Sequence, residues 1–166
     1  MTMMRIAAAT LAAGLLLAGS AIAQDVTRHK TPNSNFPIAQ AVEVPAGKTT
    51  VYVSGAVPTV VDDKAEKGSL AAYGNTKTQT ESVLKSIDKT LQGLGLKMGD
   101  VVKMQVFLVG DPEKDGKMDF EGFMEGYTQF FGTAEQPNLP SRSVMQVAGL
   151  VAPGWLVEIE VTAVRP

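Results

Sequence analysis

The sequence predicts an α+β fold of two layers, in which two helices cover one face of a mixed β-sheet. Five short segments rich in β-branched and apolar residues have the pattern of strands. Two longer segments repeat apolar residues every three or four positions, as amphipathic helices do. The predicted order is strand, strand, helix, strand, helix, strand, strand, and helices gathered on one side of a sheet give a two-layer sandwich.

The overall composition limits the classes of function. A chain of 166 residues suits one domain, and its 45% of hydrophobic residues is enough for a core. The formal net charge of −2 does not favour nucleic acid as the main partner. The chain has no cysteine and one histidine, His29, which excludes thiolate metal sites, disulfides, thiol nucleophiles and multi-histidine metal sites.

The first 23 residues have the features of a secretory signal peptide. Arg5 precedes an apolar run over residues 6–18, and Ala21-Ile22-Ala23 fits the small-x-small pattern of a cleavage site. The apolar run is shorter than the roughly 20 residues that span a bilayer. We expect cleavage after Ala23 and a periplasmic or secreted mature chain without stable membrane association. An uncleaved N-terminal anchor is the alternative.

The rest of the chain reads as an arm followed by one domain. Residues 24–36 are polar and form the arm, which can contribute a short edge strand, and residues 37–166 form the domain. Within the domain, residues 58–75 and 110–117 are charged or turn-rich and are predicted to be surface loops.

The first strands of the domain are predicted to form a hairpin. Residues 40–44 and 49–53 have strand composition, and Pro45-Ala46-Gly47 between them is typical of a turn. Ser54 and Gly55 follow the second strand. The glycine permits close approach of a ligand or another chain, or it marks a simple bend.

Two amphipathic helices flank the most apolar strand. The first begins at Thr76 and ends near Leu94, where two glycines stop it. Residues 101–109 form a buried strand. The second helix begins after Asp119, and its aromatic residues, up to Phe131, lie on one side and are expected to pack in the core.

Two strands near the C-terminus carry charged residues among apolar neighbours. Arg142 lies in the strand within residues 139–147, and Glu158 and Glu160 share one face of the strand at residues 157–161. This pattern indicates either a structural ion pair or the two ends of a site for a small anion. We also expect self-association through the sheet face without helices. That face is expected to carry Arg142, Val144, Gln146, Glu158 and Glu160.

A set of short motifs in a fixed order leads to a family resemblance. The motifs are Gln40-Ala41-Val42, Val53-Ser54-Gly55, Gln79-Thr80, Gly99-Asp100-Val101-Val102-Lys103, Val106-Phe107, residues 127–132, Pro140-Ser141-Arg142-Ser143 and Glu158-Ile159-Glu160. From Pro37 to Arg165 the chain thereby resembles the RidA family (also called YjgF/YER057c/UK114), which are small reactive-intermediate deaminases. Single motifs are weak, and the ordered set is specific.

The resemblance implies a chorismate-mutase-like fold assembled as a homotrimer, with ligand clefts between subunits. It also implies an enzyme, a hydrolase of carbon–nitrogen bonds similar to 2-iminobutanoate/2-iminopropanoate deaminase. Water adds to the imine tautomer of a 2-aminoacrylate-type intermediate and releases ammonia and a 2-oxo acid. The reaction implied by the family requires no metal or cofactor.

The resemblance also assigns roles to individual residues. Arg142 occupies the position that binds the substrate carboxylate, for which a planar guanidinium is well suited. Glu158 is the residue expected to orient the water or to pass a proton to the leaving amine. Ser54 and Gly55 are expected in the pocket wall, and Glu160 is expected to be a support or interface residue.

Several positions depart from the common family pattern. Ile38 stands where many relatives have a tyrosine, Val144 where many have a cysteine, and Met124 where some have an asparagine. The loop at residues 111–118 is also longer. These changes make the predicted pocket, which includes Ile38 and Val144, more apolar. Phe107 fits either the core or the pocket.

Export conflicts with the reaction implied by the resemblance, since the enamines that the family removes are usually made in the cytoplasm. An exported enzyme needs an exported source of imino acids, such as amino-acid oxidation. Two non-enzymatic functions therefore stay open: a binding protein that holds a small carboxylate in the same clefts, and a chaperone-like protein of the same fold.

Overall fold

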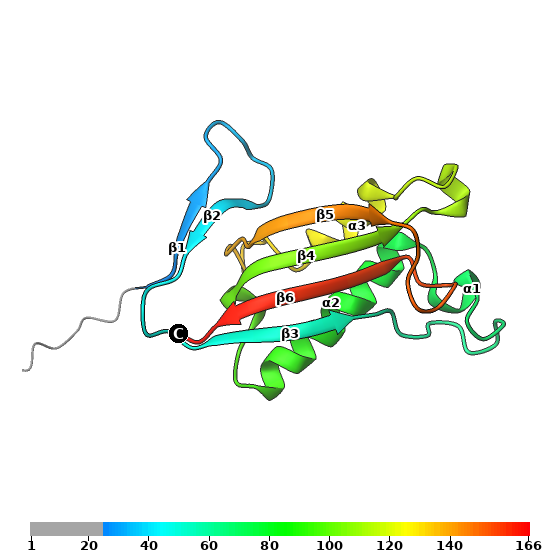
Figure 1. Ribbon diagram of the computed structural model, residues 1–166, viewed down its shortest axis with the longest axis horizontal. Coiled ribbons are helices and arrows are strands. Elements are labelled where there is room, and N and C mark those ends of the chain that lie inside the picture. Colours follow the sequence, from blue (N-terminus) through cyan, green and yellow to red (C-terminus); the bar gives the residue numbers. More distant parts are fainter. Residues whose placement is uncertain (1–24) are drawn as a thin grey trace, which may run out of the picture.

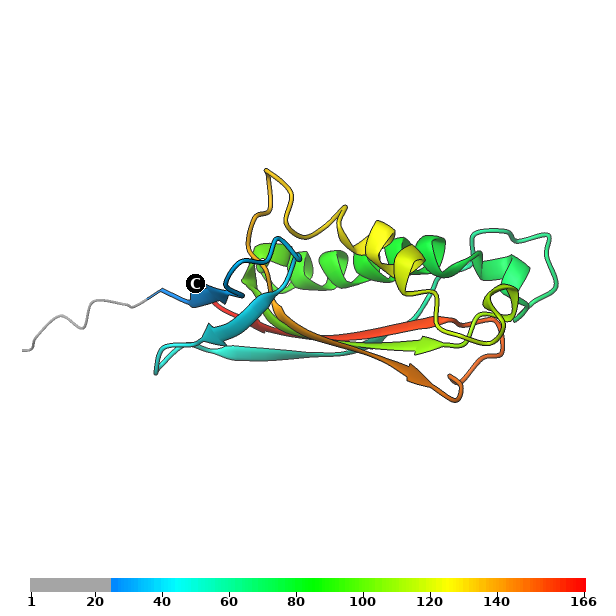
Figure 2. The same ribbon diagram turned by 90° about the horizontal axis from the view of Figure 1, so that it is seen from above.

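The apolar segments of the chain form a four-stranded mixed sheet, and the two long amphipathic segments lie as helices over one face of it (Figures 1 and 2). The computed structural model describes residues 25–166. Its elements are β1 (Thr27–Lys30), β2 (Ala39–Glu43), β3 (Thr50–Ala56), α1 (Leu70–Tyr73), α2 (Thr76–Gly93), η1 (Met98–Asp100), β4 (Val101–Val109), η2 (Pro112–Lys114), α3 (Phe120–Tyr127), β5 (Ser141–Val147) and β6 (Val157–Val164). The predicted α+β two-layer fold is confirmed.

The order of strands across the sheet is β3-β6-β4-β5. Strand β6 pairs antiparallel with both β3 and β4, whereas β4 and β5 pair in parallel. A parallel pair needs a crossover connection, and α3 lies in that connection. Strands β5 and β6 are consecutive in sequence, but β4 lies between them in space (Figure 1).

The hydrophobic core lies between the helices and one face of the sheet. Every second residue of β4 and β6 is buried on this face, as period-two alternation requires. The buried side chains from the sheet are Met104, Val106, Leu108, Val157, Ile159 and Val161, and those from the helices include Val83, Leu84, Ile87, Leu91, Phe123 and Tyr127. Burial of one such side chain contributes about 1.5–3 kcal/mol to stability.

Both amphipathic helices begin at side-chain caps, and that of α3 is the predicted Asp119. The Asn75 side chain accepts a hydrogen bond from the Thr78 amide (3.0 Å), and Asp119 accepts one from the Gly122 amide (3.1 Å). Helix α3 ends at Tyr127, so the predicted extension to Phe131 is wrong as helix. Phe131 is nevertheless buried and stacks on Tyr127, with ring centroids 5.0 Å apart, because turns continue the chain along the core.

The predicted hairpin of residues 40–44 and 49–53 is wrong. Strand β2 pairs antiparallel with β1 in a separate two-stranded sheet, whereas β3 pairs with β6. Two interactions favour this arrangement. The Arg28 guanidinium donates hydrogen bonds to the carbonyls of Val101, Leu139 and Gly99 at 2.8–3.0 Å, which holds β1 against the domain. Along β3, Val51 and Val53 pack against the core.

Residues 58–75, predicted to be a loop, contain the short helix α1. Its Ala72 and Tyr73 are buried, and Tyr73 packs edge-on against Trp155 with ring centroids 6.2 Å apart. Composition did not predict this helix, because charged residues surround its few apolar residues.

The structure tests only part of the predictions for the N-terminal region. The predicted signal peptide, residues 1–23, lies outside the described residues. The predicted arm, residues 24–36, contains β1, which pairs with β2 across the predicted boundary at residue 37. In the part of the chain that the structure describes, no helix is long and apolar enough to cross a membrane.

Candidate functional site

Arg142 projects from β5 toward helix α3, into the layer between sheet and helices. It pairs with Met104 of β4, which is fully buried on the core face. The guanidinium carbon lies 4.2 Å from the centre of the Tyr127 ring, 4.9 Å from that of Phe123 and 5.6 Å from that of Phe36. Three aromatic rings therefore surround the cation, and their electron-rich faces attract it.

No carboxylate within residues 25–166 pairs with the Arg142 guanidinium. One terminal nitrogen, Nη2, donates to the sulfur of Met124 at 3.2 Å, and the other, Nη1, is buried without a hydrogen-bond partner. The ion pairs within residues 25–166 are His29–Glu43, Lys77–Glu125 and Lys114–Asp119, and none includes Arg142. Burial lowers the pKa of Arg142, and the neighbouring Tyr127 opposes this shift. A buried donor without a partner is costly, so this environment favours an incoming anion.

Tyr127 connects the guanidinium to the segment before β2. Its hydroxyl donates a hydrogen bond to the Pro37 carbonyl at 2.9 Å. Burial raises the pKa of Tyr127 to about 12, and the charge of Arg142 acts in the opposite direction. The phenol is therefore neutral at ordinary pH, and it acts here as a hydrogen-bond donor.

Of the predicted pocket residues, Val144 lies on the Arg142 side of the sheet. Ile38 is half-buried and sits between two anchored neighbours, Pro37 and Ala39, whose amide donates to the Pro140 carbonyl at 3.0 Å. Val144 pairs with Val106 and packs against the core. Gln146 faces the same side and holds residues 116–118 through its side-chain amide.

Glu158 lies on the other face of the sheet, in close contact with Gly55. A Cβ atom on Gly55 would lie 3.0 Å from Cδ and 3.2 Å from Cγ of Glu158, and closer still to its carboxylate oxygen Oε1. A side chain at position 55 would force the Glu158 carboxylate to move, so the close approach predicted at Gly55 occurs within the chain. Phe107 pairs with Glu158 on this face and is half-buried, which places it outside the core.

A β-bulge produces this contact. Val53 pairs with Val161 and Ala56 pairs with Ile159, so Ser54 and Gly55 together lie opposite the single residue Glu160. The extra residue turns β3 so that its side chains before and after the bulge still face the core. The structure thus brings Gly55 and Glu158 together, with Ser54 beside Gly55 in the bulge.

Arg142 and Glu158 do not meet within one chain. The expectation that Arg142, Val144 and Gln146 share the helix-free face with Glu158 and Glu160 is wrong for the first three. Period-two alternation shows which residues of a strand share a face, but the pairing between strands decides which of the two faces that is. Parallel pairing of β5 with β4 aligns Arg142 with buried Met104 and so turns it toward the helices. The structural ion pair is absent from the described chain.

The helix-free face carries a shallow hollow beside Glu160. It measures about 90 Å³, and the residues that line it are Tyr52, Val53, Lys103, Gln105, Glu160, Val161 and Thr162. Tyr52 is 82% exposed, and Met145 on the same face is 38% exposed. Exposed apolar side chains mixed with charged ones on an uncovered sheet face are compatible with contact to another chain.

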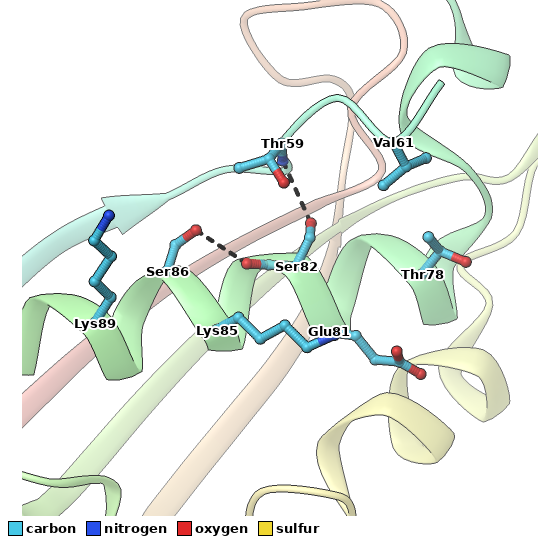
Figure 3. A pocket seen from close by; sticks show the side chains of 8 residues that line it. All are labelled: Thr59, Val61, Thr78, Glu81, Ser82, Lys85, Ser86 and Lys89. Carbon is cyan, nitrogen blue, oxygen red and sulfur yellow. Dashed lines mark hydrogen bonds between the residues drawn. The ribbon is translucent and has the colours of Figure 1, made fainter. Parts of the chain in front are cut away.

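A second hollow, whose lining includes neither Arg142 nor Glu158, lies along helix α2 (Figure 3). It measures about 350 Å³ and is lined by polar residues including Ser82, Lys85, Ser86 and Lys89. The Ser82 hydroxyl accepts from the Thr59 amide, and the Ser86 hydroxyl donates to the Ser82 carbonyl. The hydroxyl groups of Ser82 and Ser86 are therefore engaged in hydrogen bonds within the chain. Across residues 25–166, no group of three or more metal-ligating side chains is close enough to hold an ion.

Comparison with known proteins shows to which family this chain belongs. The family model described as endoribonuclease L-PSP matches residues 28–165. A 2-iminobutanoate/2-iminopropanoate deaminase from Salmonella typhimurium is 31% identical over 144 residues, which cover 87% of this chain and 99% of that protein. This chain belongs to the RidA family.

Solved structures of RidA-family proteins have the same fold. The crystal structure of TdcF from E. coli with bound serine is 29% identical, covers 86% of this chain and 99% of its own, and has a TM-score of 0.55. The YjgF gene product of E. coli is 30% identical, with a TM-score of 0.55 and coverage of 81% of this chain and 93% of its own.

The rings around Arg142 are the part of this RidA-type site that sequence reasoning missed. Phe123 and Tyr127 were assigned to the core as an aromatic stripe, and Phe36 was assigned to the arm. All three contact the guanidinium as well. The signal that could have found them is the aromatic stripe itself, since a buried arginine needs a partner for its charge.

Proposed function

We propose that this RidA-family chain is a deaminase that hydrolyses reactive 2-imino acids of the 2-aminoacrylate type to 2-oxo acids and ammonia. The observation that carries the proposal is the partly buried Arg142 guanidinium, which lies among aromatic rings with one buried nitrogen that has no hydrogen-bond partner and, within residues 25–166, no ion pair to a carboxylate. A bidentate carboxylate would supply the missing acceptors.

The proposed reaction starts from the protonated imine, whose carboxylate binds Arg142. Glu158 takes a proton from a water whose oxygen attacks the imine carbon, which gives a tetrahedral carbinolamine with a neutral NH2 group. Glu158 then passes this proton to the nitrogen. The carbon–nitrogen bond breaks and ammonia leaves, while Glu158 takes the hydroxyl proton as the 2-oxo acid forms and later releases it to ammonia or water.

The reaction needs two copies of the chain, because Arg142 and Glu158 face away from each other across the sheet. We therefore propose a homotrimer in which Arg142 of one copy and Glu158 of the next complete each cleft. Cyclic association satisfies this requirement, since each copy then gives one residue to the cleft on either side. The exposed Tyr52 and Met145 support association through the helix-free face.

The names of related proteins support the substrate class. One relative is named a 2-iminobutanoate/2-iminopropanoate deaminase, and the structure of TdcF contains serine, an amino acid with a free carboxylate. The family model carries the name of an endoribonuclease. A net charge of −2 gives this chain no excess of cations for an RNA backbone, so the carboxylate site carries the proposal.

We also propose that the chain is exported and cleaved after Ala23. The n-region, apolar run and small-x-small site in residues 1–23 support this. N-terminal sequencing of the protein from a periplasmic extract should read from Gln24. A protein recovered only with residues 1–23 attached would contradict the proposal.

A turnover assay tests the enzyme proposal. An amino-acid oxidase generates an imino acid in place, and its loss is followed with and without the mature protein. Acceleration that is lost in Arg142→Ala and strongly reduced in Glu158→Gln is expected. A lack of acceleration with every imino acid would exclude the deaminase. In that case, thermal stabilisation by 2-oxo acids would support a binding protein for small carboxylates.

A further inference from the structure

The rings beside Arg142 continue as a row toward the protein surface. Tyr127 and Phe123 have ring centroids 5.7 Å apart, Phe123 and Phe120 are 6.1 Å apart, and Phe120 and Phe36 are stacked at 6.4 Å with 17° between their planes. The row therefore begins in the core and returns to the guanidinium through Phe36, which lies 5.6 Å from it.

The two halves of this row differ in exposure. Tyr127 and Phe123 are fully buried, whereas Phe36 is 44% exposed and Phe120 is 37% exposed. Phe36 comes from the segment before β2 and Phe120 from the first turn of α3. Two elements that are far apart in sequence thus combine to place stacked apolar rings at the surface, next to the partly buried Arg142 guanidinium. Exposed apolar surface beside a charge suits a ligand that has both an anion and an apolar group.

The apolar surface of Phe36 and Phe120 discriminates among ligands that all have a carboxylate but differ in the size of their side chain. When a carboxylate lies on Arg142, the substituent on the neighbouring carbon extends over the adjacent ring surfaces. A methyl group covers little of Phe36 and Phe120, whereas a benzyl or isobutyl group reaches both and removes them from water. Met124, which contacts the guanidinium from α3, has a flexible side chain that adapts to such a group.

Within residues 25–166, no cation besides Arg142 contacts the ring faces of the row. Arg142 is the cation in contact with these rings, and the proposed reaction uses it for the substrate carboxylate. Asp119, next to Phe120, already accepts from the Gly122 amide and pairs with Lys114 at 3.7 Å. A second carboxylate on the substrate would lie against ring faces, whose electrostatic sign disfavours an anion.

We propose that this site selects 2-imino acids with an aromatic or long apolar side chain over 2-iminopropionate. The proposal rests on the proposed deaminase function and names the substrate class of the same site. It places Phe36 and Phe120 as residues that determine specificity, while Arg142 binds the carboxylate common to all the substrates.

The direct test compares kcat/KM for imino acids made in place from phenylalanine, leucine, alanine and glutamate. One added methylene in an apolar pocket typically changes kcat/KM by about 10–200-fold. We therefore expect the phenylalanine-derived and leucine-derived imino acids to exceed the alanine-derived one by about 10-fold or more, with the glutamate-derived one lowest. Equal values for all four would overturn the proposal and leave the deaminase function standing.

Variants locate the selectivity at the two exposed rings. Phe36→Ala and Phe120→Ala should each lower the ratio of phenylalanine-derived to alanine-derived kcat/KM toward one. Leu94→Ala is the matched control, since Leu94 is 42% exposed but lies beyond the C-terminus of α2, and it should leave the ratio unchanged. A ratio that survives both ring substitutions would overturn the assignment to these residues.

A binding measurement separates failure of this proposal from failure of the deaminase function. Calorimetry with phenylpyruvate and pyruvate needs no turnover. If no imino acid is hydrolysed, tighter binding of phenylpyruvate that is lost in Phe36→Ala would support the apolar selectivity while the deaminase function fails. Equal binding of the two oxo acids would overturn the selectivity, whatever the outcome of the turnover assay.

Discussion

Arg142 and Glu158 lie on opposite faces of one sheet, with strand β4 between the strands that carry them. Arg142 points into the helical layer, where it contacts Tyr127, and Glu158 lies beside Gly55 on the helix-free face. No change of side-chain conformation brings two groups through a packed sheet. A site that uses both residues must therefore combine two copies of the chain.

Mixing two inactive variants should restore activity. Arg142→Ala lacks the proposed carboxylate-binding group and Glu158→Gln lacks the proposed base, but a cleft between one copy of each has both native residues. After joint unfolding and refolding at equal amounts, random cyclic association makes about one cleft in four native, so about a quarter of wild-type activity is expected. The assay is imino-acid hydrolysis, and each variant refolded alone is the control. An inactive mixture that forms hybrid oligomers would place both residues of a working site on one chain.

Gly55→Ala should reduce turnover through the position of Glu158. The new Cβ would contact the carboxylate, so the side chain has to move, and a shift of about 1 Å at a catalytic group costs about 100-fold in rate. The free energy of unfolding should change little, because the atoms that the new Cβ meets are the far end of the flexible, half-buried Glu158 side chain. The control is Gly93→Ala at the end of α2, where a Cβ meets nothing within 4 Å. This control should leave turnover unchanged, and equal losses in both variants would contradict the role of the contact.

Arg142→Met should abolish carboxylate binding and increase stability. The lowered pKa of Arg142 indicates that the folded chain disfavours the charge, chiefly because the guanidinium is buried. Methionine keeps the apolar length and removes the unpartnered donor, so a gain of about 1–3 kcal/mol in unfolding free energy is expected. Urea denaturation measures the gain, and thermal shifts with pyruvate measure the loss of binding. A strongly destabilised variant would show that the contacts with the rings outweigh the cost of burial.

Tyr127→Phe should change the stability at high pH. Burial raises the pKa of Tyr127 from 10.0 to about 12, so the folded chain keeps the phenol proton where the unfolded chain has lost it. The stability from this group is complete below pH 10 and decreases as the pH rises from about 10 to 12, by up to about 1.4 kcal/mol per pH unit. Urea denaturation of both proteins between pH 9 and about 12 isolates this effect. Parallel pH profiles would contradict it.

The sequence was sufficient for the fold class, both long helices and the strand at residues 101–109, because their apolar periodicity is local. The hairpin prediction failed because strand pairing is not local. Val51 and Val53 find their partners on β6, over 100 residues later, and the Arg28 guanidinium draws β1 toward β4. No pattern within residues 40–53 carries this information.

The candidate site was predicted residue by residue, but its geometry was not. Ordered motifs pointed to Arg142, Glu158, Ser54 and Gly55. The face that each residue occupies depends on the pairing of β5 with β4, which a single strand does not reveal. The aromatic surroundings of Arg142 also depend on the crossing of α3 over β5, so they became apparent only in three dimensions.

The bulge at Ser54 and Gly55 also affects how the protein avoids aggregation. Strand β3 is an edge strand in the described sheet, and a regular edge offers unpaired backbone groups to any extended chain nearby. The extra residue breaks the even spacing of those groups in the middle of the edge. The irregularity that positions Glu158 against Gly55 therefore also disfavours the addition of a further strand from another molecule to this exposed edge.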